Sequence, residues 1–181
     1  MRLFTAIELP AAVCETLAGA QAELKREITG KVSWTGPRNL HLTLKFLGEV
    51  PDSDVPALCN ALGKITSPRM SLAISHLSQL PPNGAARVLM AGVEDSDQSL
   101  AKLFGAIEYT VEPLGFAREK RKFRPHITLG RMRMPRRVSR ELERVKLEPT
   151  RPFEVKEFVL MQSVLSNVGS QYTRVMTVHL G

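Results

Sequence analysis

The chain has 181 residues, a length that fits one compact domain or two small lobes around a shared core. Its hydrophobic fraction of 43% and charged fraction of 24% are those of a folded globular protein and exclude a disordered chain. No apolar stretch approaches the roughly 20 residues of a transmembrane helix, and the N-terminus lacks a signal-peptide pattern. We therefore expect a cytoplasmic protein with no membrane partner, and the net charge of +7 points to an anionic one.

The hydrophobic pattern alternates between the periods of strands and helices along the whole chain. We expect strands over residues 2–9, 41–48, 70–75, 87–93, 126–131, 154–161 and 172–180. We expect helices over residues 11–27, 53–65, 96–112 and 138–147, with Gly30 and Gly115 as stop signals. Residues 81–84 and Gly169 mark turns.

The second half of the chain repeats the order of elements of the first. His126 follows His41 by 85 residues, and Val88 follows Leu3 by the same interval. This shift also carries helix 11–27 onto 96–112, strand 70–75 onto 155–160, and Ser78 and Leu80 onto Ser163 and Leu165. The repeat predicts an α+β fold with two pseudo-symmetric lobes, each an antiparallel sheet with helices on its outer face. We expect residues 1–181 to form a single two-lobed domain with the active-site groove between the lobes.

Two of the expected strands carry the same His-x-Thr pattern. Residues two apart in a strand point to the same face. His41 and Thr43 therefore share a face, and so do His126 and Thr128, while the leucine and isoleucine residues between them face the core. Each strand thus offers one imidazole and one hydroxyl to the groove.

Paired imidazoles suit the cleavage of a phosphodiester. One proton must leave the attacking oxygen and another must reach the leaving oxygen, and imidazoles titrate near neutral pH, so one can be the base and the other the acid. The threonine hydroxyls can donate hydrogen bonds to the phosphate oxygens. The scheme requires no metal and no other cofactor, and the sequence lacks the carboxylate cluster of a two-metal nuclease.

A basic segment encloses the second motif, with Glu119 as its only acid. Such clustering predicts a contact with a phosphate backbone, although a merely solvated face has the same composition. Its basic residues are Arg118, Lys120, Arg121, Lys122, Arg124, Arg131, Arg133, Arg136, Arg137 and Arg140.

The remaining histidines and cysteines are interpreted as structural. Cys14 and Cys59 form no Cys-x-x-Cys pair and have no nearby histidine to complete a zinc site. His76 and His179 have no counterpart in the other half.

The segments Arg38–Gly48 and Arg124–Arg131 resemble the paired His-x-Thr motifs of the 2H phosphoesterase superfamily. Within it, the chain most resembles the RNA 2′,3′-cyclic phosphodiesterases of bacteria and archaea, historically called 2′-5′ RNA ligases. The segments Arg2–Pro10 and Leu160–Ser163 are also similar to that family, so the resemblance covers nearly the whole chain.

The resemblance implies an enzyme that hydrolyses an RNA 2′,3′-cyclic phosphate to a 2′-phosphomonoester. It assigns the proton donor to His41, the proton acceptor to His126, and phosphate binding to Thr43, Thr128 and Arg131. The residues alone yield the histidine pair but leave open which is acid and which is base. Strict alternation places Arg131 on the face opposite His126, so its contact with phosphate requires the strand to twist or end there.

Three alternatives stay open at this point. At the same site, an RNA hydroxyl replacing water would ligate a cyclic phosphate to a 5′-hydroxyl. The substrate could instead be a small one, such as a cyclic phosphate on a nucleotide or an ADP-ribose derivative, or the basic groove could bind RNA without catalysis. The partner we expect is RNA with a 2′,3′-cyclic phosphate end. Because one chain supplies both halves of the site, we expect a monomer with no obligate protein partner.

Overall fold

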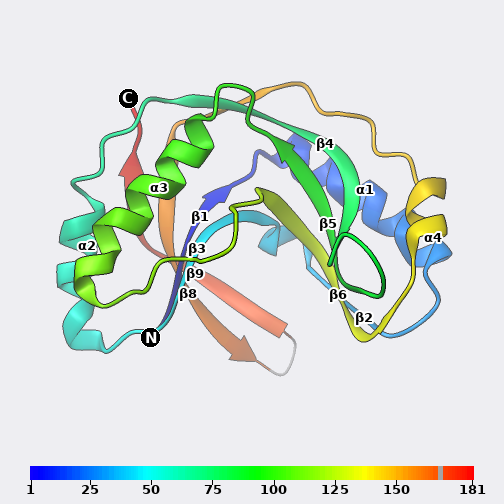
Figure 1. Cartoon of the computed structure of the whole chain (residues 1–181), viewed down its shortest axis with the longest axis horizontal. Helices are drawn as coiled ribbons and strands as arrows, with labels where there is room; N and C mark the ends of the chain where they lie inside the picture. The colour runs from blue at the N-terminus through cyan, green and yellow to red at the C-terminus, as the bar shows by residue number, and fades with distance from the viewer. Residues whose placement is uncertain (167–168) are drawn as a thin grey trace.

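A computed structural model describes residues 1–166 and 169–181, which form nine strands and four α-helices (Figure 1). The strands are β1 (Arg2–Glu8), β2 (Val32–Trp34), β3 (His41–Glu49), β4 (Met70–Leu80), β5 (Ala86–Glu94), β6 (His126–Arg136), β7 (Phe153–Val155), β8 (Glu157–Ser166) and β9 (Gly169–His179). The helices are α1 (Ala11–Glu27), α2 (Val55–Leu62), α3 (Ser99–Val111) and α4 (Ser139–Arg144).

The strands form an antiparallel arrangement in which the strand order on one side of the centre mirrors the order on the other side. The order is β7-β4-β5-β6-β3-β1-β8-β9, with β2 also paired to β6. The two histidine strands, β3 and β6, are central, and each is flanked by the first strand of its own half. The predicted α+β fold with two pseudo-symmetric halves is therefore confirmed, and the half-sheets meet at β3 and β6.

Ladder pairing shows which residues of the two halves are equivalent. Phe4 of β1 pairs with Phe46 of β3, and Val88 of β5 pairs with Arg131 of β6. The shift between the central strands is thus 131 − 46 = 85, as predicted, but the shift from β1 to β5 is 88 − 4 = 84. The predicted equivalence of Leu3 with Val88 is wrong by one residue.

The outer strands drift further from the predicted shift. Phe4 pairs with Met161 on its other side, whereas Val88 pairs there with Leu80. The equivalent of Leu80 is therefore Met161, a shift of 81 residues. The connections between strands differ in length in the two halves, so one constant shift cannot hold along the chain. The predicted equivalences of Ser78 with Ser163 and of Leu80 with Leu165 are wrong.

The long helix of each half of the chain packs against the histidine strand of the other half. Helix α1 lies with α4 beside the half-sheet of β4, β5 and β6, while α2 and α3 lie at the half-sheet of β1, β3, β8 and β9 (Figure 1). Gln21 of α1 hydrogen bonds to Leu129 of β6, and Glu108 of α3 forms an ion pair with Lys45 of β3. One buried apolar cluster spans both half-sheets. That residues 1–181 form a single two-lobed domain stays a prediction.

Most expected elements are present, with changed boundaries. The expected strand 154–161 is divided into β7 and β8, β4 and β6 extend well beyond their predicted ends, and β2 had no counterpart in the prediction. The turn that we expected at Gly169 adjoins residues 167–168, which lie outside the described residues. Cys14 and Cys59 are free and half-buried. Within the described residues, no helix has both the length and the apolar character to cross a membrane.

Candidate active site

The two His-x-Thr motifs meet where β3 pairs with β6 in the sheet. Leu42 and Ile127 are register partners, and both side chains are fully buried on the core side. Their neighbours in each strand are half-buried and point to the opposite face, toward the groove. If the antiparallel register is extended by one residue, His41 lies across from Thr128, and Thr43 lies across from His126. The pairing of β3 with β6 thus brings both motifs to one face of the sheet, as the sequence predicts.

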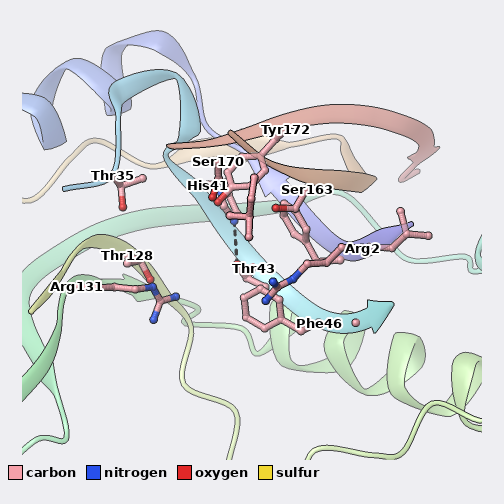
Figure 2. A pocket seen from close by; sticks show the side chains of 14 residues that line it. Arg2, Thr35, His41, Thr43, Phe46, Thr128, Arg131, Ser163, Ser170 and Tyr172 are labelled. Carbon is pink, nitrogen blue, oxygen red and sulfur yellow. Dashed lines mark hydrogen bonds between the residues drawn. The ribbon is translucent and has the colours of Figure 1, made fainter. Parts of the chain in front are cut away.

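A cavity of about 460 Å³ opens on this face. Of the predicted site residues, His41, Thr43, Thr128 and Arg131 line it, and Figure 2 shows their side chains directed toward a common space. His126 is not among the lining residues. It lies on the same strand as Thr128, two residues earlier.

Arg131 reaches the cavity because β6 contains a β-bulge. Met90 pairs with Thr128 and Leu89 pairs with Gly130, so Leu129 is an extra residue without a ladder partner in β5. One extra residue reverses the alternation of side chains beyond it. Arg131 therefore shares the face of Thr128, and the face that strict alternation predicts for it is wrong.

Strand β3 carries the same bulge. Ala6 pairs with Thr43 and Thr5 pairs with Lys45, which leaves Leu44 as the extra residue. Phe46 consequently joins His41 and Thr43 on the groove face, where its side chain is 65% exposed. Phe46 and Arg131 are equivalent in the two halves, so one half presents an aromatic ring where the other presents a guanidinium.

Both imidazoles are held in the same orientation. The Nδ1–H of His41 donates to the carbonyl of Asn39 at 2.7 Å, and the Nδ1–H of His126 donates to the carbonyl of Arg124 at 2.8 Å. A carbonyl oxygen only accepts, so the proton of each neutral ring is on Nδ1. Nε2 is then free to accept a proton or, in the imidazolium form, to donate one. In His41 this atom lies 3.0 Å from the Thr43 hydroxyl.

The surroundings of His41 favour its neutral form when the site is empty. Its ring contacts those of Phe4 and Tyr172, with centroid distances of 5.0 and 5.2 Å. Burial lowers the pKa of His41 from its ordinary value because desolvation disfavours the imidazolium, and the positive charge of Arg131 lowers it further. The hydrogen bond to Asn39 and the negative charge of Glu8 act in the opposite direction, but burial is the larger effect.

Much of the cavity wall comes from residues that the sequence did not single out as site residues. They lie in β1, after β2, in β3, and in β8 and β9. None of the lining side chains in the described part of the chain is a carboxylate, so the wall suits an anion. These additional lining residues are Arg2, Leu3, Phe4, Thr35, Phe46, Gly48, Ser163, Leu165, Ser170 and Tyr172. Phe46 had a detectable signal, since it follows His41 by the same five residues as Arg131 follows His126.

His76 and His179, interpreted as structural, do not line the cavity. The ring of His76 packs over Gly92, where an added Cβ atom would lie 2.5 Å from it, and Nδ1 of His179 lies 3.3 Å from the Glu157 carboxylate. Among the residues that the structure describes, no group of three or more His, Cys, Asp or Glu side chains is arranged to hold a metal ion.

The basic segment is divided between different roles. Arg118 pairs with Glu112 at 2.7 Å, and Arg136 pairs with Glu141 at 3.0 Å. The loop before β6, by contrast, exposes Lys120, Arg121, Lys122 and Arg124 immediately before His126. These four side chains remain candidates for contact with a nucleic-acid backbone.

The model of the LigT-like phosphoesterase family matches residues 7–90 and again residues 92–172. The two matches begin 85 residues apart, which agrees with the internal repeat. Two similar curated proteins are both named RNA 2′,3′-cyclic phosphodiesterase. That of Archaeoglobus fulgidus is 30% identical over 173 residues, which cover 95% of this chain and 96% of the relative. That of Methanocaldococcus jannaschii is 28% identical over 175 residues, which cover 95% of this chain and 96% of the relative.

The fold is similar to that of a solved structure from the same family. The crystal structure of Escherichia coli LigT complexed with 3′-AMP superposes with a TM-score of 0.79 at 29% sequence identity. The superposition covers 99% of this chain and 97% of the other. The similarity in sequence and in fold therefore extends over the entire two-lobed architecture.

Proposed function

This chain belongs to the LigT-like phosphoesterases of the 2H phosphoesterase family, and from that premise we propose that it hydrolyses an RNA 2′,3′-cyclic phosphate to a 2′-phosphomonoester. The observation that carries the proposal is one cavity lined by a histidine and a threonine of the first motif and by a threonine and an arginine of the second. The names of the curated relatives supply the reaction and the RNA substrate.

The proposed reaction divides the two proton transfers between the histidines. Nε2 of His126 accepts a proton from water as the water oxygen attacks phosphorus. Nε2 of His41, in its protonated form, donates a proton to the 3′ oxygen as the P–O3′ bond breaks. Each transfer contributes on the order of 10²–10⁴ to the rate. The carbonyls of Asn39 and Arg124 support these roles because they fix Nδ1 and direct Nε2 away from the backbone.

The threonines and Arg131 are proposed to bind the phosphate. Hydroxyl and guanidinium donors stabilise the charge that builds on the non-bridging oxygens as phosphorus becomes five-coordinate. An anion bound here also favours the imidazolium form of His41, which lies beside it. Substrate binding thus counteracts the low pKa that burial gives to this residue and prepares it to act as the acid.

The aromatic side of the cavity is suited to the terminal nucleoside. Phe46 is exposed, and its ring centroid lies 6.0 Å from that of Phe4, which in turn contacts Tyr172. A base that stacks on such a surface gains about 1–3 kcal/mol with little sequence preference. We therefore propose that RNA ends of varied sequence are substrates. We also propose that the protein acts as a monomer in the cytoplasm.

Turnover of a defined RNA end tests the proposal. The purified protein is incubated in EDTA with an oligonucleotide that ends in a 2′,3′-cyclic phosphate, and the product is identified by mass and by resistance to a 3′-specific phosphatase. We expect an oligonucleotide with a 2′-phosphate. Tight binding with no product would instead indicate an RNA-binding module.

Ligation is measured in the same system. Addition of an oligonucleotide with a 5′-hydroxyl should give a 2′-5′ linked product in proportion to its concentration, because the 5′-hydroxyl takes the place of water as the nucleophile while the P–O3′ bond breaks as before. Water is in large excess, so hydrolysis should dominate. Turnover of nucleoside 2′,3′-cyclic monophosphates but not of oligonucleotides would identify a small nucleotide as the substrate.

A further inference from the structure

Two arginines line the cavity, and they enter it from different elements. Arg131 comes from β6 beside Thr128, and Arg2 comes from the start of β1 (Figure 2). Neither forms an ion pair with any residue that the structure describes. The cavity wall contributes no carboxylate to either of them. Both guanidiniums are therefore available to an anionic ligand.

The two arginines are anchored at different places along the cavity. Ala6 is the register partner of Thr43, and Arg2 is four residues earlier on β1. At about 3.3 Å per residue, Arg2 is anchored about 13 Å along the strand from the level of Thr43. Arg131, in contrast, is anchored three residues from Thr128 on its own strand. The cyclic phosphate is accounted for by Arg131, the threonines and the histidines, which leaves Arg2 for a second anionic group.

Phe46 lies between these two positions. It pairs with Phe4, two residues along β1 from Arg2, and its exposed ring faces the cavity. Figure 2 shows the Arg2 side chain extending back toward Phe46 and Thr43. Along the strands, the cavity therefore presents the anchor points of phosphate-binding groups, of an aromatic side chain and of a guanidinium, in this order. The end of an RNA chain has a matching order, namely the cyclic phosphate, the nucleoside, and the phosphate on its 5′ oxygen.

We infer that Arg2 binds the phosphate on the 5′ oxygen of the terminal nucleoside, which in RNA is the phosphodiester to the preceding nucleotide. This inference deepens the proposed function, on which it rests, by making an RNA end a better substrate than a nucleoside 2′,3′-cyclic monophosphate. A guanidinium forms two parallel hydrogen bonds to one phosphate, so the contact is both attractive and directional.

The test compares three substrates and three proteins. The substrates are a nucleoside 2′,3′-cyclic monophosphate, a dinucleotide with a 2′,3′-cyclic phosphate end, and the same dinucleotide with a neutral methylphosphonate linkage. The proteins are the wild type, Arg2→Met, and Arg26→Met as a control that removes an exposed arginine of α1 outside the cavity. Melting temperatures check that each variant is folded.

Arg2→Met should lower kcat/KM on the natural dinucleotide about tenfold, mainly through KM, because the contact is made equally in the ground state and the transition state. It should leave the mononucleotide and the methylphosphonate unchanged, and Arg26→Met should change none of the three. Equal losses on all three substrates would overturn the inference by placing Arg2 at the cyclic phosphate. No loss on any of them would overturn it as well.

A binding measurement separates this inference from the proposed function. The affinity of the protein for a dinucleotide with a 2′-phosphate is compared with its affinity for the methylphosphonate analogue, using the wild type and Arg2→Met. The wild type should prefer the natural linkage about tenfold, and Arg2→Met should not discriminate. This result is expected even if the wild type turns over no substrate. The same affinity of the wild type for both ligands would contradict the inference.

Discussion

The side-chain amide of Gln21 donates a hydrogen bond of 2.7 Å to the carbonyl of Leu129, the extra residue of the bulge in β6. The same nitrogen donates to the carbonyl of Thr35 at 2.8 Å, and the backbone N–H of Thr35 donates to Leu129 at 2.9 Å. Gln21 lies on α1 and is only 2% exposed. A buried side chain of one half thus holds the backbone feature that turns Arg131 into the cavity.

Replacement of Gln21 by Leu should both destabilise the protein and impair the site. The Thr35 carbonyl loses its amide donor, which costs about 1–3 kcal/mol of unfolding free energy, measurable by urea denaturation. We expect kcat/KM to fall about tenfold because Arg131 is no longer held in place. Glu23→Leu, on the exposed face of the same helix, is the control and should change neither quantity.

A double-mutant cycle shows whether Gln21 acts through Arg131. If it does, Gln21→Leu should lower the activity of an Arg131→Met variant far less than that of the wild type. Full additivity of the two effects would mean that Gln21 contributes to the fold alone.

Removal of either imidazole should abolish most turnover and spare binding. His41→Ala and His126→Ala each remove one proton transfer, so kcat should fall at least 10²-fold while the affinity for RNA changes little. His179→Ala is the matched control, since that ring lies outside the cavity. Near-normal turnover in either of the first two variants would rule out the paired acid–base mechanism.

The pH dependence of turnover follows from the burial of His41. As the proposed acid, His41 must be protonated, and burial lowers its pKa in the free enzyme. The protonated fraction falls as pH rises, so the alkaline limb of kcat/KM should lie below the ordinary histidine value of about 6.5. The limb of kcat should lie at higher pH, because bound phosphate favours the imidazolium. If kcat/KM rises steadily with pH, with no alkaline limb up to pH 8, His41 is not the acid.

The lowered pKa of His41 should also make the unfolding free energy of the protein increase with pH. A histidine whose pKa is lowered by folding binds more protons in the unfolded state than in the folded one. Its presence therefore costs stability at low pH, and the unfolding free energy increases as pH rises through the folded pKa toward about 6.5. His41→Asn should show a smaller increase over that range in denaturant titrations.

Removal of one partner of the buried ion pair between Lys45 and Glu108 should lower the unfolding free energy more than removal of both partners. Their charged atoms lie 2.7 Å apart, Lys45 is 6% exposed, and the pair also binds the backbone of Ala117 and Glu119. Glu108→Leu leaves an unpaired buried ammonium and should cost about 3–5 kcal/mol of unfolding free energy. The double variant Lys45→Met, Glu108→Leu should recover much of this loss. A double variant that is less stable than Glu108→Leu would contradict this account.

Added salt should lower the turnover of long RNA because it weakens the contacts of the loop before β6 with the phosphate backbone. Lys120 and Lys122 are exposed there, next to the second motif. Each phosphate contact with single-stranded RNA contributes about −0.7 to the slope of log kcat/KM against log salt. Lys120→Ala, Lys122→Ala should flatten the slope by up to about 1.4 on a long oligonucleotide. Removal of two exposed charges outside this loop and the cavity, Arg26 and Lys64, should leave it unchanged.

The sequence by itself determined the local part of the site. Alternation with a period of two follows from the backbone of a single strand, so His41 and Thr43 share a face wherever that strand is placed. The same holds for His126 and Thr128. The order of elements in the two halves likewise predicted a symmetric α+β fold, because helix and strand patterns are local.

Only the tertiary structure decided which other residues join the motifs. A bulge is defined by two residues facing one on a neighbouring strand, so the face of Arg131 depends on β5 and on Gln21 rather than on the sequence of β6 alone. The cavity wall from β1, β8 and β9, which includes Arg2 and Tyr172, depends on strands that meet β3 only after the chain has folded. Contacts between distant segments leave no periodic signal in the sequence, and for that reason these residues were found only in the fold.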